Sequence, residues 1–269
     1  MTTPPPRPTV ALAVTCLVDQ VAPMVGRAVV EVLHRLGVRV EVPGGQTCCG
    51  QPAFNSGYRD EARRAAGPLR QLQRELAARP MESRVAALVV PSGSCALMVR
   101  RHFAELFDDA DDADATAIPV LEFGEYVAQR LRELGWSSVP QPPPEGTPSA
   151  GTLRRVAWHS SCHLLRGLDA DTNARELTAA IDGLDVVTLD PRQECCGFGG
   201  LFSVKLPEIS ADMAHGKASA AAAMEVDAVI AGDMGCLLNI GGALRRQGSR
   251  VRALHYAQVL AGPAFCHEQ

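Results

Sequence analysis

Short apolar runs alternate with longer amphipathic stretches along the chain. In the first half these runs are brief and rich in β-branched residues, which is typical of buried strands; they lie at 10–14, 38–42, 85–90 and 118–122. Apolar side chains recur every three or four residues between Val25 and Leu36, which predicts a helix. Asp19 is a candidate cap for this helix, Pro23 lies near its start and Gly37 ends it. Further helices are expected at about 59–78, which looks charged and exposed, up to about Phe107, and at 124–134.

The second half of the chain repeats this order. Its pattern predicts strands at 155–158, 186–189 and 227–231, and helices at about 171–182 and 208–224. Strands that alternate with helices form a parallel sheet with helices on both faces. The pattern therefore predicts an α/β fold class in which each half is a mainly parallel sheet flanked by helices.

Nine cysteines make the repeat explicit, and eight of them form two matching sets. The first set is Cys16, Cys48, Cys49 and Cys95, and the second set is Cys162, Cys195, Cys196 and Cys236. Thirty-one residues separate Cys16 from Cys48, and 32 separate Cys162 from Cys195. The flanking sequence repeats as well, since TCCGQPAFNSGY at 47–58 corresponds to ECCGFGGLFSV at 194–204. The chain is therefore predicted to contain two pseudo-symmetric duplicated lobes, at 1–136 and 152–269, joined by a proline-rich linker at 137–151.

The cysteines of each set follow the carboxyl ends of predicted strands. In an open parallel sheet these ends lie along one edge, where ligands bind, so four thiols are expected to converge in each lobe. Four thiolates suit zinc or an iron–sulfur cluster. The chain has no C-x-x-C knuckle of the kind used by structural zinc, and glycines after each vicinal pair allow N–H bonds to sulfide. An iron–sulfur cluster is therefore favoured over zinc, and a dithiol redox site at a vicinal pair is a third alternative.

Composition narrows the classes of function further. The chain has 269 residues, a formal charge of −4 and 46% hydrophobic residues, which is ordinary for a globular protein. The near-neutral charge argues against nucleic-acid binding, and no apolar run approaches the roughly 20 residues of a transmembrane segment. The N-terminus has no secretory signal, so a cytoplasmic location with reduced thiols is expected. The sequence carries no nicotinamide, flavin or nucleotide motif, which favours an electron relay over a self-sufficient dehydrogenase.

The repeated C-x31/32-C-C-G element resembles the cysteine-rich CCG domain. That domain occurs in the B subunit of heterodisulfide reductase and in iron–sulfur subunits of glycolate and anaerobic glycerol-3-phosphate oxidation. Two copies in a chain of this size most closely resemble the lactate-utilisation protein A (LutA/YkgE) family. The residues that carry the resemblance are CLVDQ at 16–20, CCGQPAFNSGY at 48–58, SGSC at 92–95, HSSCHLLRG at 159–167 and ECCGFGG at 194–200.

This resemblance implies an iron–sulfur electron-transfer subunit of a cytoplasmic complex that oxidises L-lactate to pyruvate. It also implies two partner subunits, one of them a ferredoxin-like iron–sulfur protein. Glycolate or another 2-hydroxy acid is the alternative substrate. The alternative of another class is a zinc-stabilised scaffold or a thiol-redox protein.

The eight paired cysteines are the expected ligands of one or two clusters, most simply of the [4Fe–4S] type. Full CCG motifs end in C-x-x-C and provide five thiols per lobe, whereas here Ser92 and Asp233 replace the first cysteine of that element. Four thiols per lobe are enough for a cubane cluster. Asp233 is a candidate oxygen ligand to iron or a cap on the next helix, and Ser92 is interpreted as a turn residue.

Several other residues are candidate neighbours of a cluster. His159 and His163 flank Cys162, where a histidine can ligate iron, donate to sulfur or relay protons. His163 has no counterpart in the first lobe and is not counted as a ligand. Arg166 and Lys205 are candidate cations near a cluster. Cys266 has no repeat partner and is interpreted as incidental.

Overall fold

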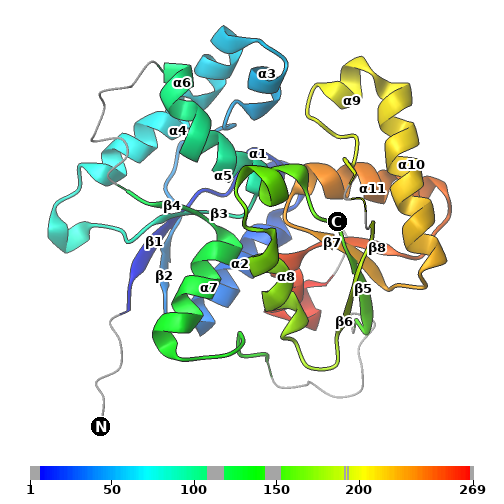
Figure 1. Cartoon of the computed structure of the whole chain (residues 1–269). Helices are drawn as coiled ribbons and strands as arrows, with labels where there is room; N and C mark the ends of the chain where they lie inside the picture. The colour runs from blue at the N-terminus through cyan, green and yellow to red at the C-terminus, as the bar shows by residue number, and fades with distance from the viewer. Residues whose placement is uncertain (1–6, 108–117, 143–152, 191, 193, 267–269) are drawn as a thin grey trace.

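Two four-stranded parallel sheets lie at the centre of the computed structural model, which describes residues 7–107, 118–142, 153–190, 192 and 194–266 (Figure 1). The strands of the first sheet are β1 (Thr9–Leu12), β2 (Arg39–Glu41), β3 (Leu88–Val90) and β4 (Val120–Glu122). Those of the second are β5 (Arg155–Trp158), β6 (Asp185–Thr188), β7 (Ala228–Ala231) and β8 (Arg252–His255). The strand orders are β2-β1-β3-β4 and β6-β5-β7-β8. The identical order confirms the predicted α/β fold with two duplicated lobes.

Helices flank both sheets. Those of the first lobe are α1 (Cys16–Val21), α2 (Pro23–Arg35), α3 (Gln51–Asn55), α4 (Arg59–Ala77), η1 (Met81–Ser83), α5 (Gly93–Leu97), η2 (Met98–His102), α6 (Phe103–Phe107) and α7 (Phe123–Leu134). Those of the second lobe are η4 (His163–Gly167), α8 (Asp171–Ala179), α9 (Phe202–Lys205), α10 (Pro207–Ala223), α11 (Met234–Arg246), α12 (Tyr256–Ala261) and η5 (Pro263–Phe265). In the described part of the chain, no helix has the length and apolar character needed to cross a membrane.

Two expectations about the helices are wrong. Asp19 does not cap the helix that follows, because it lies inside the separate short helix α1 and α2 begins at Pro23. Helix α4 is amphipathic rather than exposed, because it buries Ala62, Ala66 and Leu69 against the first lobe. The frequent charges in α4 lie on its other face and obscure this apolar stripe in the sequence.

Helices from the two lobes pack against each other across the interface, and the helix pairs are related by a pseudo-two-fold axis. Helix α2 packs on α12 and its counterpart α8 packs on α7, the counterpart of α12. In the same way α1 packs on α11, while η4 packs on α5. An apolar cluster also spans both lobes, since Trp158 and Tyr256 of the second lobe belong to the same core as Phe123 of the first. The carboxyl ends of β1, β3, β5 and β7 therefore face the interface between the lobes.

The predicted linker falls partly outside the described residues. Of the stretch 137–151, residues 137–142 are described, and Val139 is buried in the shared core. Gln141 donates to the backbone carbonyl of Leu260 at 3.2 Å. This end of the stretch is therefore packed against the second lobe.

Candidate functional site

All eight paired cysteines line one cavity of about 290 Å³ between the lobes. Four of them lie just beyond the strands that face the interface: Cys16 after β1, Cys95 after β3, Cys162 after β5 and Cys236 after β7. The vicinal pairs lie in the loops after β2 and β6. The parallel topology thus brings together thiols that are up to 220 residues apart in the sequence, as counted from Cys16 to Cys236.

The first cysteine set forms a chain of neighbouring thiols. The sulfur atoms of Cys49 and Cys95 lie 3.3 Å apart. Hydrogen bonds from Cys16 and then from Cys49 lower the pKa of the Cys48 thiol, while the bond to Cys48 and burial raise the pKa of Cys16. One thiol of this set is therefore favoured as the thiolate, which is the form that binds metals.

The second set repeats this arrangement, with Cys195 exposed and both Cys196 and Cys236 buried. The sulfur atoms of Cys196 and Cys236 lie 2.9 Å apart. A hydrogen bond from Cys162 lowers the pKa of the Cys195 thiol, just as Cys16 lowers that of Cys48. Cys236 is buried, whereas its counterpart Cys95 is half-buried. The two sets share their connectivity but differ in their surroundings.

A glycine in the left-handed region shapes both cysteine turns. Gly50 has φ of 82° and Gly197 has φ of 81°, and each donates its N–H to the first sulfur of its vicinal pair at 3.4 Å. A Cβ atom at Gly50 would lie 2.6 Å from the carbonyl oxygen of Ala62, and one at Gly197 would lie 2.9 Å from that of Ser210. Only glycine fits this backbone and this close approach without strain.

Asp233 joins the two lobes, and the interpretation of its side chain as a helix cap is wrong. It precedes α11 but makes no capping bond there. Its Oδ1 accepts hydrogen bonds from the Ser92 hydroxyl at 2.8 Å, from the Ser94 hydroxyl at 2.8 Å and from the Ser94 N–H at 3.0 Å. Its Oδ2 accepts from the Ser161 hydroxyl at 2.5 Å. Both carboxylate oxygens are thus engaged by serines, two of which belong to the other lobe.

Ser92, predicted as a turn residue, also caps a helix and binds Asp233. It is the N-cap of α5, where its hydroxyl oxygen accepts from the N–H of Cys95 at 3.3 Å. The same hydroxyl donates to Asp233. The two positions that lack a cysteine relative to the full motif therefore face and bind each other across the interface. Sequence reasoning missed Ser94 and Ser161, because nothing in the local sequence marks residues whose partner lies on the other lobe.

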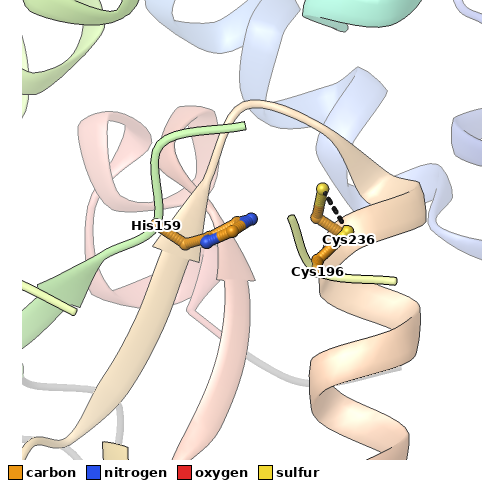
Figure 2. A group of neighbouring side chains, drawn as sticks. All are labelled: His159, Cys196 and Cys236. Carbon is orange, nitrogen blue, oxygen red and sulfur yellow. Dashed lines mark hydrogen bonds between the residues drawn. The ribbon is translucent and has the colours of Figure 1, made fainter. Parts of the chain in front are cut away.

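His159 is the polar neighbour of the second set (Figure 2). A ring nitrogen of His159 and the sulfur atoms of Cys196 and Cys236 all lie within 4.8 Å of one another. The side chain is 3% exposed, and its Nε2 has no hydrogen-bond partner among the described residues. The far end of its imidazole points toward the two thiols in Figure 2.

The other candidate residues lie elsewhere around the cysteines or away from them. His163 Nδ1 lies 3.5 Å from the sulfur of Cys162, and its Nε2 lies 3.4 Å from the side-chain nitrogen of Gln51. Lys205 is exposed and donates to the Tyr58 hydroxyl at 2.7 Å. Cys266 is buried beside α12, where its thiol lies 3.7 Å from the carbonyl oxygen of Gln258, and it does not line the cavity.

The donor set fits a metal–thiolate centre. Each lobe offers four thiols, one favoured thiolate and a backbone N–H on sulfur, and the cavity shields several of these sulfurs from water. In the second lobe a buried imidazole adds a further polar group. Thiolate ligation of zinc or of an iron–sulfur cluster uses these same groups.

Comparison with known proteins agrees with the duplication. The model of the CCG cysteine-rich domain matches residues 10–100 and again 156–241. Lactate utilization protein A 1 of Bacillus anthracis is 37% identical over 94% of this chain and 97% of its own length. Lactate utilization protein A of Oceanobacillus iheyensis is 36% identical over 93% of this chain and 96% of its own length.

Similarity to solved structures is much weaker. An aspartate racemase homologue from Pyrococcus horikoshii superposes with a TM-score of 0.33 and 10% identity over 95% of this chain and 96% of that chain. This likeness says nothing about the chemistry of the cysteines. The two CCG matches, each spanning one cysteine set, and the full-length relatives show that the chain belongs to the lactate utilization protein A family of CCG cysteine-rich proteins.

Proposed function

We propose that each lobe binds a [4Fe–4S] cluster through its four cysteines and that the chain carries electrons in the oxidation of L-lactate to pyruvate. The observation that supports this most is that both cysteine sets line one cavity between the lobes. Iron–sulfur clusters of this type are held by four cysteine thiolates. Because the two sets share one cavity, their clusters would be neighbours.

The protein's own groups prepare the thiols for such a cluster. The N–H groups of Gly50 and Gly197 stabilise negative charge on Cys48 and Cys195. Burial of Cys49, Cys196 and Cys236 limits their contact with water. A bound cluster supplies one-electron transfer, and the chain holds it, shields it and donates hydrogen bonds to its sulfur ligands.

The lactate assignment comes from the relatives and not from a substrate pocket. Proteins named for lactate utilization match nearly the full length of the chain. The family resemblance leads us to propose that the chain works with two partner subunits in the cytoplasm, one of them a ferredoxin-like iron–sulfur protein, and the absence of a nicotinamide or flavin motif in the sequence agrees with a role as an electron relay. Glycolate or another 2-hydroxy acid is the alternative substrate, and growth of a deletion strain on each acid separates these.

A zinc site in the second lobe is the second candidate. It is favoured by one observation, the cluster of His159, Cys196 and Cys236 within 4.8 Å, because zinc accepts mixed nitrogen and sulfur ligands. The first lobe has no histidine at the corresponding position, where Ala13 stands. A zinc site that uses a histidine ligand would therefore be confined to the second lobe.

Anaerobic purification followed by iron, sulfide and zinc analysis tests the proposal. We expect about eight iron and eight sulfide per chain, from one [4Fe–4S] cluster per lobe. Cys195→Ser plus Cys196→Ser is expected to halve both numbers, and Cys48→Ser plus Cys49→Ser to remove the other half. Cys266→Ser, outside the cavity, serves as the control that retains all metal. Zinc without sulfide would contradict the cluster, and lactate-dependent growth that survives loss of both sets would contradict the electron-transfer role.

A further inference from the structure

We infer that His159 makes the two cysteine sets unequal, by donating a hydrogen bond to the sulfur ligands of the second set and so raising the reduction potential of that lobe's cluster above that of the first. This inference rests on the proposed iron–sulfur function. It assigns His159 as a positioning and tuning residue and not as a ligand.

The sheet fixes the position of the His159 ring. His159 follows β5 directly, and its backbone N–H donates to the carbonyl of Ile230 at 2.8 Å, which continues the ladder between β5 and β7. The side chain is buried in the same region as the cysteines of the second set. The imidazole is therefore held by the sheet and not by a mobile loop.

Nε2 of His159 is buried and has no partner in the described ranges of the chain. A buried donor without an acceptor is unfavourable, so such groups are almost always paired in folded proteins. The sulfur atoms of Cys196 and Cys236 are the acceptors that the ring faces (Figure 2). Thiolate sulfur carries negative charge and accepts an N–H bond more strongly than a thiol does.

The first lobe has no counterpart of His159. His159 lies three residues before Cys162, and the residue three before Cys16 is Ala13. Ala13 is buried at the end of the equivalent strand and has no side-chain donor. The glycine N–H bonds to sulfur are the same in both lobes, at 3.4 Å each. His159 is therefore a buried group beside the sulfurs of Cys196 and Cys236 that the first lobe lacks, whereas His163, 3.5 Å from the sulfur of Cys162, lies at another cysteine of the set.

The consequence follows from electrostatics. A hydrogen bond to a sulfur ligand stabilises the more negative, reduced state of a cluster more than the oxidised state, which raises its reduction potential. Electrons that enter the two clusters would then reside mainly on the cluster of the second lobe. Equivalent cysteine sets would in this way give a directional relay.

The test is a redox titration of the anaerobic protein followed by electron paramagnetic resonance, with iron content measured on the same samples. The wild type is expected to show two potentials. His159→Ala is expected to lower the higher potential by at least a tenfold change in the reduction equilibrium, which is about 59 mV for one electron. His159→Gln, which keeps a donor, is expected to restore part of the shift. The variant Cys48→Ser plus Cys49→Ser assigns the higher potential, because only the second-lobe cluster should remain.

Each other outcome overturns the inference in a recognisable way. If His159→Ala keeps full iron and both potentials stay unchanged, the histidine does not tune the cluster, and the proposed function stands. If His159→Ala loses the iron of the second lobe and glutamine does not restore it, the histidine is a ligand. If the wild type binds no iron and sulfide after reconstitution, the proposed function itself fails, before any potential is measured.

Discussion

The two lobes have the same backbone fold but differ in the residues that contact each other across the interface. Their strand order and their glycine-bounded cysteine turns are the same. Ser92 and Asp233, however, occupy equivalent positions three residues before the last cysteine of each set, and they bind each other across the interface. A residue on a pseudo-two-fold axis meets its own counterpart, so two aspartates there would repel each other. Divergence of one copy turns the pair into a donor and an acceptor.

A second hydrogen bond across the interface is likewise made once and is absent at the symmetry-equivalent position. Tyr256 donates from its hydroxyl to the buried carboxyl of Glu122 at 2.7 Å. The equivalent residues are Phe123, which has no hydroxyl, and His255, whose Nε2 is buried without a partner among the described residues. The two lobes thus keep the same arrangement of cysteines, while several contacts across the interface are made by one lobe only.

The largest expected effect comes from the residue that joins the lobes. Asp233→Ala would leave the hydroxyls of Ser92, Ser94 and Ser161 without their common acceptor, in a buried site. We expect a loss of about 3–5 kcal/mol in the free energy of unfolding, measured by urea denaturation of the anaerobic protein. The equivalent substitution on the other lobe, Ser92→Ala, removes one donor to Asp233 and the N-cap acceptor of α5, and is expected to cost about 2 kcal/mol. Equal losses for the two variants would contradict the asymmetry.

The cysteine turns should respond alike in the two lobes. Gly50→Ala and Gly197→Ala each place a Cβ on a left-handed backbone and close to a carbonyl oxygen, at 2.6 Å and 2.9 Å. We expect each to destabilise the protein by about 2–3 kcal/mol, with the larger effect at Gly50. Gly44→Ala is the matched control, because a Cβ there meets nothing within 4 Å. A large effect in one lobe only would show that the turns are not equivalent.

The pH dependence of stability should have opposite sign in the two lobes. Burial raises the pKa of Glu122 to about 8, so the folded state keeps a proton that the unfolded carboxyl has already lost. The contribution of Glu122 to the free energy of unfolding is therefore lost as pH rises from about 4.5 through 8. Burial lowers the pKa of His255 to about 4, so its contribution is present above pH 6.5 and lost as pH falls through 4.

Two substitutions separate these contributions. Glu122→Gln keeps an acceptor for the N–H of Gly124 and is expected to flatten the alkaline side of the stability curve, by about 2 kcal/mol. His255→Asn keeps a capping acceptor for the N–H of Ala257 and is expected to flatten the acid side by a similar amount. Urea midpoints from pH 4 to 9 provide the measurement. Parallel curves for wild type and both variants would refute the assignment.

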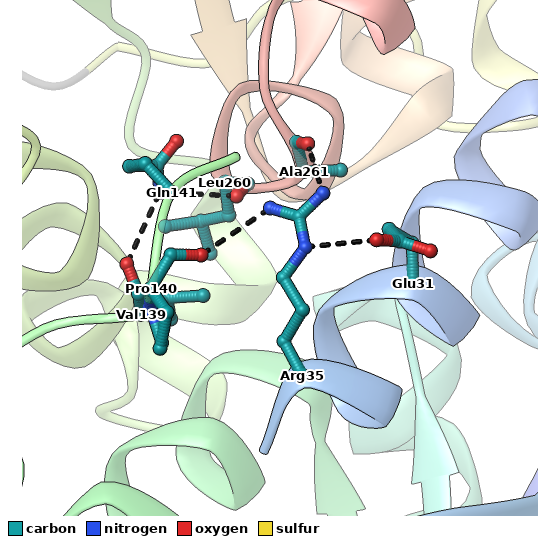
Figure 3. A network of polar contacts seen from close by, with 7 residues as sticks. All are labelled: Glu31, Arg35, Val139, Pro140, Gln141, Leu260 and Ala261. Atoms are coloured by element: carbon teal, nitrogen blue, oxygen red, sulfur yellow. Dashed lines mark hydrogen bonds and ion pairs between the residues drawn. The ribbon is translucent and has the colours of Figure 1, made fainter. Parts of the chain in front are cut away.

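The smallest expected effect lies at the outer end of the interface (Figure 3). Arg35 of α2 donates to the carbonyls of Ala261 at 2.8 Å and Pro140 at 3.3 Å, and pairs with Glu31 at 2.8 Å. The equivalent position in α8's lobe is Ile181, so this contact too is made once. Arg35→Lys loses the planar fork and is expected to lower the free energy of unfolding by about 1 kcal/mol. Arg27→Lys, on an exposed face of the same helix, should change it by less than about 0.5 kcal/mol.

Much of the fold could be predicted because the necessary information is local or repeated. Strand β5 was expected at its observed bounds, since a short apolar run signals a buried strand. The short helices α3 and α9, of five and four residues, were not predicted, because such lengths show no helical periodicity. The prediction that Asp19 caps a helix is wrong because the sequence does not distinguish an aspartate inside a short helix from an aspartate that precedes a longer one.

The sequence by itself determined that the chain is a duplicated α/β protein and that its cysteines follow strand ends, because hydrophobic periodicity and an internal repeat can be read without knowing any long-range contact. Only the tertiary structure decided that the two sets line one cavity, that Asp233 binds three serines and that His159 faces Cys196 and Cys236. The hydrogen bonds of Asp233 join residues as much as 141 positions apart, and the cavity brings together cysteines up to 220 positions apart. They depend on how two sheets pack about a pseudo-two-fold axis, which no local pattern encodes.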